Sequence, residues 1–191
     1  MNRKNILVTV FILVAIVQLY VPVKMILDKE TVLDAGIEYK FKTAPVDPSD
    51  PFRGKYITLS YEGNSIVVKP ESDWIRGEHI YVMLSRDNEG FSRIKAISKE
   101  VPSQEQDYFK AEIRFVTLKG PKKVVINYPF NRYYMEETKA YTAELAYRES
   151  QKDSSKVTYA LVSVWEGEAV LKDVLIDGVS INEIVERKKV K

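Results

Sequence analysis

Hydrophobic and polar residues separate sharply at the amino end of the chain. Residues 2–5 include Arg3 and Lys4, and residues 6–23 then follow as eighteen positions without a charge. At a helical rise of about 1.5 Å per residue, eighteen residues span about 27 Å, close to the hydrocarbon thickness of a bilayer. The pattern therefore predicts a transmembrane helix over residues 6–23.

Two other interpretations of this apolar run were weighed. A cleaved signal peptide requires small residues after a shorter apolar core, and the stretch Tyr20-Val-Pro-Val-Lys24 offers none. A buried core helix is disfavoured because the run is apolar on all faces. Arg3 and Lys4 favour a cytoplasmic amino end at residues 1–5, although Lys24 and Lys29 weaken that bias. We expect a retained single-pass anchor in the cell membrane and an extracytoplasmic remainder.

Beyond a connector at residues 24–34, partly helical at most, apolar residues mostly recur at every second position. This period is typical of half-buried strands, and the turns between them are marked by Gly, Asp and Asn. The sequence also predicts that Pro22 lies in the last turn of the anchor or ends it. Strands are expected at 37–41, 56–61, 66–69, 80–84, 91–98, 109–115, 124–126, 157–165, 169–176 and 179–181, with hairpins at 80–98 and 157–176.

One region departs from the alternating pattern. Residues 132–151 lack Gly and Pro and include three alanines, so a helix is predicted at least over residues 136–148. The predicted fold class is mainly β with antiparallel strands and one soluble α-helix (α+β), behind the transmembrane helix. Residues 35–185 form either one sandwich or barrel-like domain or two lobes divided near 99–106. Residues 186–191 are a basic, solvated tail.

Composition narrows the possible chemistry. The 191 residues contain 29 basic and 27 acidic side chains, a balance that argues against nucleic-acid binding. The chain has no cysteine, which excludes disulfides and thiolate sites, and its single histidine excludes a His-cluster metal site. We expect no cofactor and no metal.

The densest cluster of special residues is the stretch at 45–62. Pro48 and Pro51 favour extended conformations at Asp47 and Asp50, whose carboxylates commonly cap turn amides. Arg53 is placed to pair with either aspartate. A structural turn is one interpretation, and an oxygen-rich ion site or a partner surface is the other. The candidate residues are Asp47, Asp50, Arg53, Gly54, Tyr56, Leu59 and Tyr61.

A second candidate block surrounds the start of the predicted helix. Arg132 is suited to holding an anion, and Glu137 and Glu144 are seven residues apart, on one helical face. The structural interpretation is that Glu137 favours the helix dipole and Arg132 pairs with a loop carboxylate. Tyr133 is expected to pack rather than to form part of a ligand site.

These blocks carry a resemblance to a known family. Gly54-Lys-Tyr-Ile-Thr-Leu-Ser-Tyr61 resembles the motif that names the GDYXXLXY family of bacterial proteins. The block at 131–137, the stretch 162–171 and Leu175-Ile-Asp-Gly178 are similar to the family's later blocks, in the same order. Lys55 stands where the motif has Asp, so no acidic role transfers to that position. The resemblance implies a membrane-anchored protein and supplies no reaction.

Catalytic templates find little support in the sequence. One histidine beside Glu78 does not define a Ser-His-Asp triad, and the sequence contains no Gly-rich phosphate loop. The favoured function is a non-enzymatic binding or envelope-complex module. Its expected partners are the membrane and a multi-spanning membrane protein reached through Thr9 and Gln18. The alternative is an envelope hydrolase or ion-binding protein that uses residues 47–53 with Arg132 and Glu137.

Overall fold

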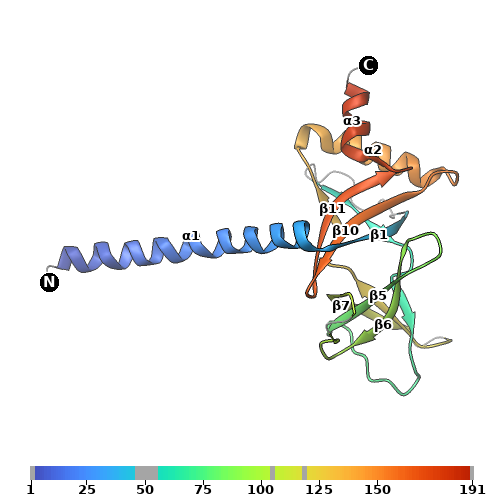
Figure 1. Cartoon of the computed structure of the whole chain (residues 1–191), viewed down its shortest axis with the longest axis horizontal. Coiled ribbons are helices and arrows are strands. Elements are labelled where there is room, and N and C mark those ends of the chain that lie inside the picture. The colour runs from blue at the N-terminus through green and yellow to red at the C-terminus, as the bar shows by residue number, and fades with distance from the viewer. Residues whose placement is uncertain (1–2, 46–55, 104–105, 118–119, 190–191) are drawn as a thin grey trace.

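The computed structural model describes residues 3–45, 56–103, 106–117 and 120–189. A long helix leaves a folded part that contains two five-stranded sheets, a two-stranded sheet and two further helices (Figure 1). The elements are α1 (Arg3–Ala35), β1 (Ile37–Ala44), β2 (Tyr56–Thr58), β3 (Ser60–Tyr61), β4 (Ser65–Val67), β5 (His79–Arg86), β6 (Ser92–Ser98), β7 (Tyr108–Thr117), β8 (Lys123–Asn127), β9 (Arg132–Tyr134), α2 (Glu137–Lys152), β10 (Thr158–Trp165), β11 (Glu168–Ile176), β12 (Val179–Ser180) and α3 (Ile181–Lys189).

Helix α1 contains the apolar run and continues to Ala35, a total of 33 residues. The segment 24–34 is thus helical throughout, and Pro22 lies inside the helix rather than at its end. Proline removes one backbone donor, yet its fixed φ is compatible with helical geometry. Among the described residues, α1 is the helix that is long and apolar enough to cross a membrane, and its most apolar window is not covered by the folded part.

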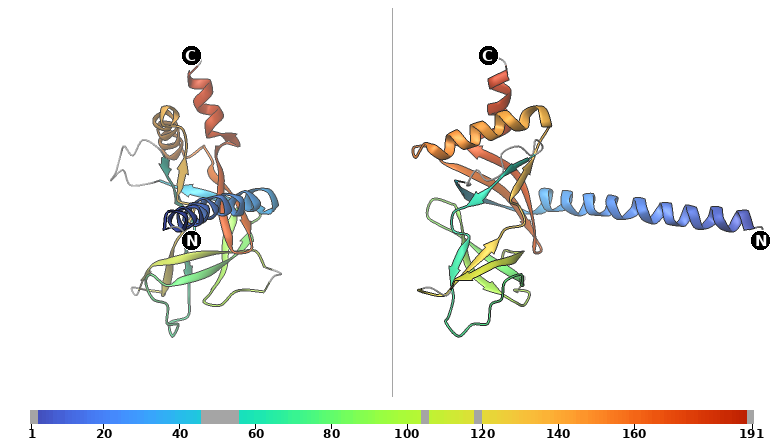
Figure 2. Two further views of the ribbon diagram at one scale, coloured as in Figure 1. Left: turned by 90° about the vertical axis from the view of Figure 1, so that its left-hand side faces the viewer. Right: turned by 180° about the vertical axis from the view of Figure 1, so that it is seen from behind.

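The first five-stranded sheet, here called sheet 1, has the order β12-β11-β10-β1-β3 and is antiparallel. In β1, Tyr39, Phe41 and Thr43 are buried while Lys40 between them is exposed, as the alternating pattern predicts. Helices α2 and α3 pack against each other beside this sheet, at the end of the molecule opposite to the second large sheet (Figures 1 and 2).

Sheet 2 has the order β4-β8-β7-β5-β6 and is also antiparallel. Its buried face carries side chains from β5, β7 and β8, all of them apolar. The segment 99–106 joins β6 and β7, and both strands pair with β5. Because that segment connects two strands of one sheet, the suggested division between two lobes does not fall there. The buried apolar residues are Ile80, Val82, Leu84, Phe109, Ala111, Ile113, Val124 and Ile126.

One hydrophobic cluster joins the two large sheets. At its centre, the ring of Phe41 in sheet 1 contacts the rings of Tyr61, Phe109, Tyr128 and Phe130, with centroid distances of 4.9 to 6.2 Å. Several of these pairs meet edge to face, the arrangement that the aromatic quadrupole favours. The folded part therefore has a single continuous core.

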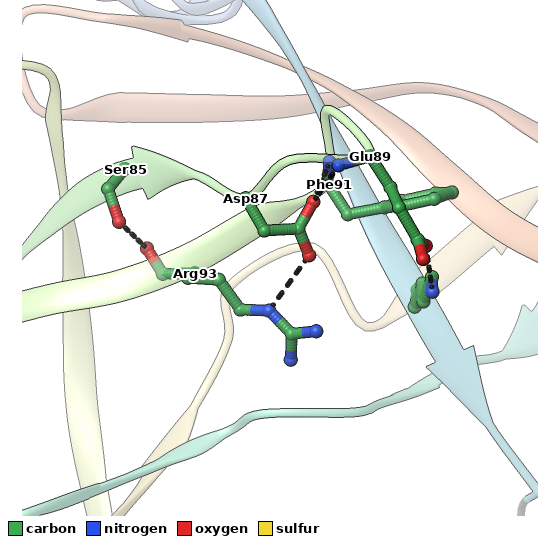
Figure 3. A network of polar contacts seen from close by, with 6 residues as sticks. Ser85, Asp87, Glu89, Phe91 and Arg93 are labelled. Carbon is green, nitrogen blue, oxygen red and sulfur yellow. Dashed lines mark hydrogen bonds and ion pairs between the residues drawn. The ribbon is translucent and has the colours of Figure 1, made fainter.

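The turn between β5 and β6 fastens sheet 2 to sheet 1 (Figure 3). The Asp87 carboxylate accepts hydrogen bonds from the backbone N–H groups of Glu89 at 3.1 Å and Phe91 at 2.8 Å, and pairs with Arg93 Nε at 3.0 Å. Lys42 of β1 reaches this turn, with its Nζ 2.8 Å from Glu89 and 4.5 Å from the centroid of the Phe91 ring. The turn is thereby held in shape and held against β1.

The α+β fold class and both expected hairpins are confirmed, and the predicted helix is confirmed from Glu137 onward, with Glu136 as its N-cap. Helix α3 is an element that the sequence reasoning missed. The strand expected at 179–181 pairs with β11 only through Val179 and Ser180, and the chain then turns helical. Ile181 and Val185, four positions apart, are fully buried, so the helical period places both against the core. Part of the expected basic tail thus belongs to a packed helix.

Candidate functional site

The two candidate blocks, far apart in the sequence, lie side by side in the fold. They form the two-stranded sheet of β2 and β9, and the Leu59 N–H extends it by donating to the Asn131 carbonyl oxygen at 2.9 Å. The sequence indicates both blocks as candidate sites, but it does not predict that they pair as strands. The register joins Tyr56 with Tyr134, Ile57 with Tyr133, and Thr58 with Arg132.

The outer face of this small sheet carries an exposed arginine beside two tyrosines that contact each other. The Arg132 Cζ lies 5.0 Å from the centroid of the Tyr56 ring, and the Tyr56 and Tyr134 rings are 5.4 Å apart. A hydrogen bond with Tyr134 raises the pKa of Arg132, and the two tyrosines add a smaller electrostatic effect. This contact orients a permanent cation on the surface by cation–π attraction. The expected pairing of Arg132 with a loop carboxylate stays a prediction, because Asp47 and Asp50 lie outside the described residues.

The opposite face of the sheet is buried through Ile57 and Tyr133. The Tyr133 hydroxyl donates to Asp173 Oδ1 in β11 at 3.0 Å and accepts from Asn182 Nδ2 in α3 at 2.7 Å. Burial is the main reason that the pKa of Tyr133 lies above its ordinary value, with the Asp173 carboxylate as the second cause. Tyr133 thus ties β9 to sheet 1 and α3, in accord with its expected packing role.

Leu59 and Tyr61 of the first block are core residues. Leu59 is buried, and the buried Tyr61 hydroxyl donates to the Phe130 carbonyl oxygen at 2.7 Å. Burial raises the pKa of Tyr61 well above its ordinary value, which keeps the phenol neutral. These positions of the motif serve packing, with a polar atom satisfied inside an aromatic cluster.

The acidic candidates near α2 have different surroundings. Glu137 lies exposed in the first turn of the helix, where a negative charge interacts favourably with the helix dipole. Glu144 forms an ion pair with Arg148 at 2.7 Å, one helical turn away. Within the part of the chain that the structure describes, neither Arg132 nor Glu137 belongs to an ion pair. A joint role of the two carboxylates stays a prediction.

Four candidates, Asp47, Asp50, Arg53 and Gly54, lie outside the described residues, as does Lys55. The hypothesis that residues 47–53 converge with Arg132 and Glu137 therefore stays a prediction. Across the described ranges, no group of three or more His, Asp or Glu side chains is arranged to hold a metal ion.

Sequence reasoning missed the contact between the anchor and the folded part. The buried Ser163 hydroxyl in β10 donates to the Val32 carbonyl oxygen at 2.7 Å, and the Gly36 N–H donates to the same oxygen at 3.1 Å. A Cβ on Gly36 would lie 2.4 Å from that oxygen and 2.5 Å from Ser163 Oγ. Lys29 pairs with Glu168 of β11 at 2.7 Å, one turn before Val32. A glycine directly after an apolar helix is the one sequence signal that marks this junction.

Comparison with known proteins identifies the family of the chain. The family model described as GDYXXLXY protein matches residues 18–174, which extend from the second half of the apolar run to near the end of β11. Neither a curated protein nor a solved structure matches the chain. The match covers most of the chain and includes both blocks that pair as β2 and β9, so the chain belongs to the GDYXXLXY family.

Proposed function

We propose that this chain is a single-pass, membrane-anchored module whose β-rich folded part lies outside the cytoplasm and binds a protein partner in a bacterial cell envelope. The observation that carries the proposal is α1. Its apolar side chains are exposed all round the helix, including Phe11, Leu19 and Leu27, while its last turn is fixed to the fold. Exposed apolar surface of this extent requires a nonaqueous environment.

The orientation follows from the charges that flank the apolar run. Arg3 and Lys4 precede it and favour a cytoplasmic amino end. On the other side, Lys24 pairs with Asp28 at 3.2 Å and Lys29 pairs with Glu168. Both lysines on this side are thus paired with carboxylates, which reduces the net positive charge there. The carboxy-terminal part is placed outside on this balance.

A membrane partner is supported by Gln18, whose side chain is exposed in the middle of the apolar run. An amide in hydrocarbon is costly unless it is hydrogen-bonded, and helix–helix contacts supply such bonds. Thr9 differs, because its hydroxyl already donates to the Asn5 carbonyl oxygen at 2.9 Å within the helix. Gln18 is therefore the better candidate for a contact with a multi-spanning protein.

We prefer binding to the hydrolase or ion-site alternative because of the surroundings of Arg132. Within the described ranges, Arg132 contacts two tyrosines, which hold the guanidinium on an exposed face. An arginine and aromatic side chains at a surface are typical of binding hot spots. The exposed β2–β9 face is accordingly the proposed partner contact of the folded part.

The absence of cysteine allows a direct test of topology. Single cysteines are introduced by Lys156→Cys in the exposed turn before β10 and, separately, by Asn5→Cys at the amino end, and intact cells are treated with a membrane-impermeant maleimide. We expect Lys156→Cys to react before lysis and Asn5→Cys to react only afterwards. The reverse order of labelling, or recovery of the protein in the soluble fraction, would contradict the proposal.

A further inference from the structure

The folded part is attached to α1 in a fixed position. The last turn of the helix is held by the Ser163–Val32 hydrogen bond, by the Gly36 contact and by the Lys29–Glu168 pair. The attachment involves buried backbone and leaves no room for a Cβ at Gly36, so the helix end and sheet 1 move as one body. The depth of the folded part relative to the bilayer is then set by the length of α1.

This depth can be estimated from the helical rise. The uncharged run of α1 extends from Ile6 to Val23, which at about 1.5 Å per residue is about 27 Å, close to a hydrocarbon core of about 30 Å. Lys24 follows directly, and Lys29 lies about 22 Å along the axis from the middle of the run. With its headgroup layers a bilayer is about 40 to 45 Å thick, so the headgroups end about 20 to 22 Å from the bilayer middle. Lys29 therefore falls at the outer edge of the headgroup layer.

The β10–β11 turn is tied to the helix at this level. Glu168, the first residue of β11, pairs with Lys29 at 2.7 Å and with Lys110 at 3.7 Å. Its partner in the strand register is Trp165, the last residue of β10. The turn lies on the side of the folded part from which α1 leaves (Figure 1), and the view along the helix shows the sheets extending to both sides of it (Figure 2).

Trp165 is on the helix side of this hairpin. It follows Ser163 by two positions, and alternate residues of a strand face the same way; Ser163 contacts α1 directly. The Trp165 side chain is 39% exposed although it is large and aromatic. Tryptophan is enriched at the membrane–water interface, where the ring contacts the acyl boundary and the indole N–H reaches polar headgroups.

We infer that the β10–β11 turn, residues 165–168, rests in the lipid headgroup layer of the bilayer that α1 crosses, with the Trp165 indole in contact with lipid. The inference rests on the proposed anchor. It gives the folded part a second attachment to the membrane, beside the helix, and fixes which of its faces is turned away from the bilayer. The exposed β2–β9 face is then presented to partners at a constant height.

The chain contains two tryptophans, so each can be observed alone. Full-length Trp74→Phe keeps Trp165, and full-length Trp165→Phe keeps Trp74 as the matched control. Trp74 lies between β4 and β5, with Lys99 Nζ 5.3 Å from its ring centroid. The segment 68–78 runs at the end of sheet 2 remote from α1 (Figures 1 and 2). Both variants are reconstituted into phosphatidylcholine vesicles that contain a nitroxide on the choline headgroup, or none.

We expect the headgroup nitroxide to quench Trp165 emission more strongly than Trp74 emission. Equal quenching of the two variants, in protein that floats with the vesicles, would overturn the inference while the anchor stands. Protein that fails to float with the vesicles would overturn the proposed anchor and this inference together. A nitroxide deep in the acyl chain provides a further check, because it is expected to quench Trp165 less than the headgroup label does.

Discussion

The Ser163 hydroxyl donates a hydrogen bond to the Val32 carbonyl oxygen at 2.7 Å, and this bond joins the end of α1 to the middle of sheet 1. The last carbonyl groups of a helix lack partners within the helix. Here a strand residue supplies one, and Ser163 is fully buried. Helix α1 and the folded part are thus joined through a buried polar contact and not through a flexible linker.

Removal of this hydroxyl provides the first prediction. Ser163→Ala leaves the buried Val32 carbonyl with a single partner, the Gly36 N–H, and we expect a loss of about 1 to 3 kcal/mol in the free energy of unfolding. The measurement is thermal or denaturant unfolding of the full-length protein in detergent. Ser85→Ala is the matched control, because its hydroxyl makes only a long 3.5 Å contact with the Arg93 carbonyl oxygen. Equal stability of the two variants would mean that Ser163 does not hold the helix.

Tyr133 leads to a second prediction, which separates the two faces of the β2–β9 sheet. Tyr133→Phe removes a hydroxyl that bonds to both Asp173 and Asn182, so we expect a loss of about 1 to 3 kcal/mol in stability. Tyr134→Phe, on the exposed face, is expected to change stability by less than about 0.5 kcal/mol. Urea unfolding of both variants tests the difference. If Tyr133→Phe unfolds at the wild-type midpoint, the link from β9 to α3 is not a stabilising one.

The sequence predicted strands such as β1 and β5 because their environment is regular, whereas β9 at Arg132–Tyr134 was not among the expected strands. In β1 and β5, one face meets the core and the other meets solvent. Apolar and polar residues therefore alternate along these strands. Helix α2 was equally visible, because a stretch without Gly and Pro carries buried Ala140, Ala143 and Ala146 at helical spacing.

Other features depend on contacts between distant segments, and no local pattern encodes those. The pairing of β2 with β9, the bond between Tyr133 and Asn182, and the docking of α1 on β10 all join residues separated by long stretches of chain. Helix α3 was missed for a different reason: it starts directly after two strand residues, so its short apolar pattern was read as a strand. Of the candidate site, the sequence identified the residues but not their arrangement.

A third prediction concerns alkaline pH. Burial, the hydrogen bond to Asp107 at 2.5 Å and the charge of that carboxylate raise the pKa of Tyr39 to about 12. Burial likewise raises the pKa of Tyr61, Tyr128 and Tyr133. In the unfolded chain these phenols ionise near pH 10. Because their folded pKa values are raised, their contribution to stability is fully present below about pH 10 and is lost as the pH rises toward the folded values.

We therefore expect the free energy of unfolding to fall steadily above about pH 10. In parallel, absorbance at 295 nm is expected to show Tyr39, Tyr61, Tyr128 and Tyr133 titrating only as the protein unfolds. Tyr39→Phe is expected to flatten the alkaline decline relative to the wild type. A wild-type protein whose tyrosines all ionise together near pH 10, with the fold intact, would contradict this prediction.

The last prediction concerns the Lys29–Glu168 pair at the base of the anchor. The hydrogen bond from Lys29 is the largest cause that lowers the pKa of Glu168, and Lys110 adds to it. Because the pKa of Glu168 is lower in the folded protein, the pair stabilises the docked helix above the unfolded pKa of Glu168. This contribution disappears as the pH falls through the folded pKa.

We expect Glu168→Gln to lower the melting temperature of the full-length protein at neutral pH. In acid we expect it to match the wild type, because Glu168 is then protonated in both the folded and the unfolded wild-type protein. Glu149→Gln serves as the control, because it removes a comparable exposed pair with Lys188 at 3.2 Å that lies away from α1. A Glu168→Gln deficit that persists unchanged in acid would assign the loss to packing, and the charge of Glu168 would then have no part in holding the anchor.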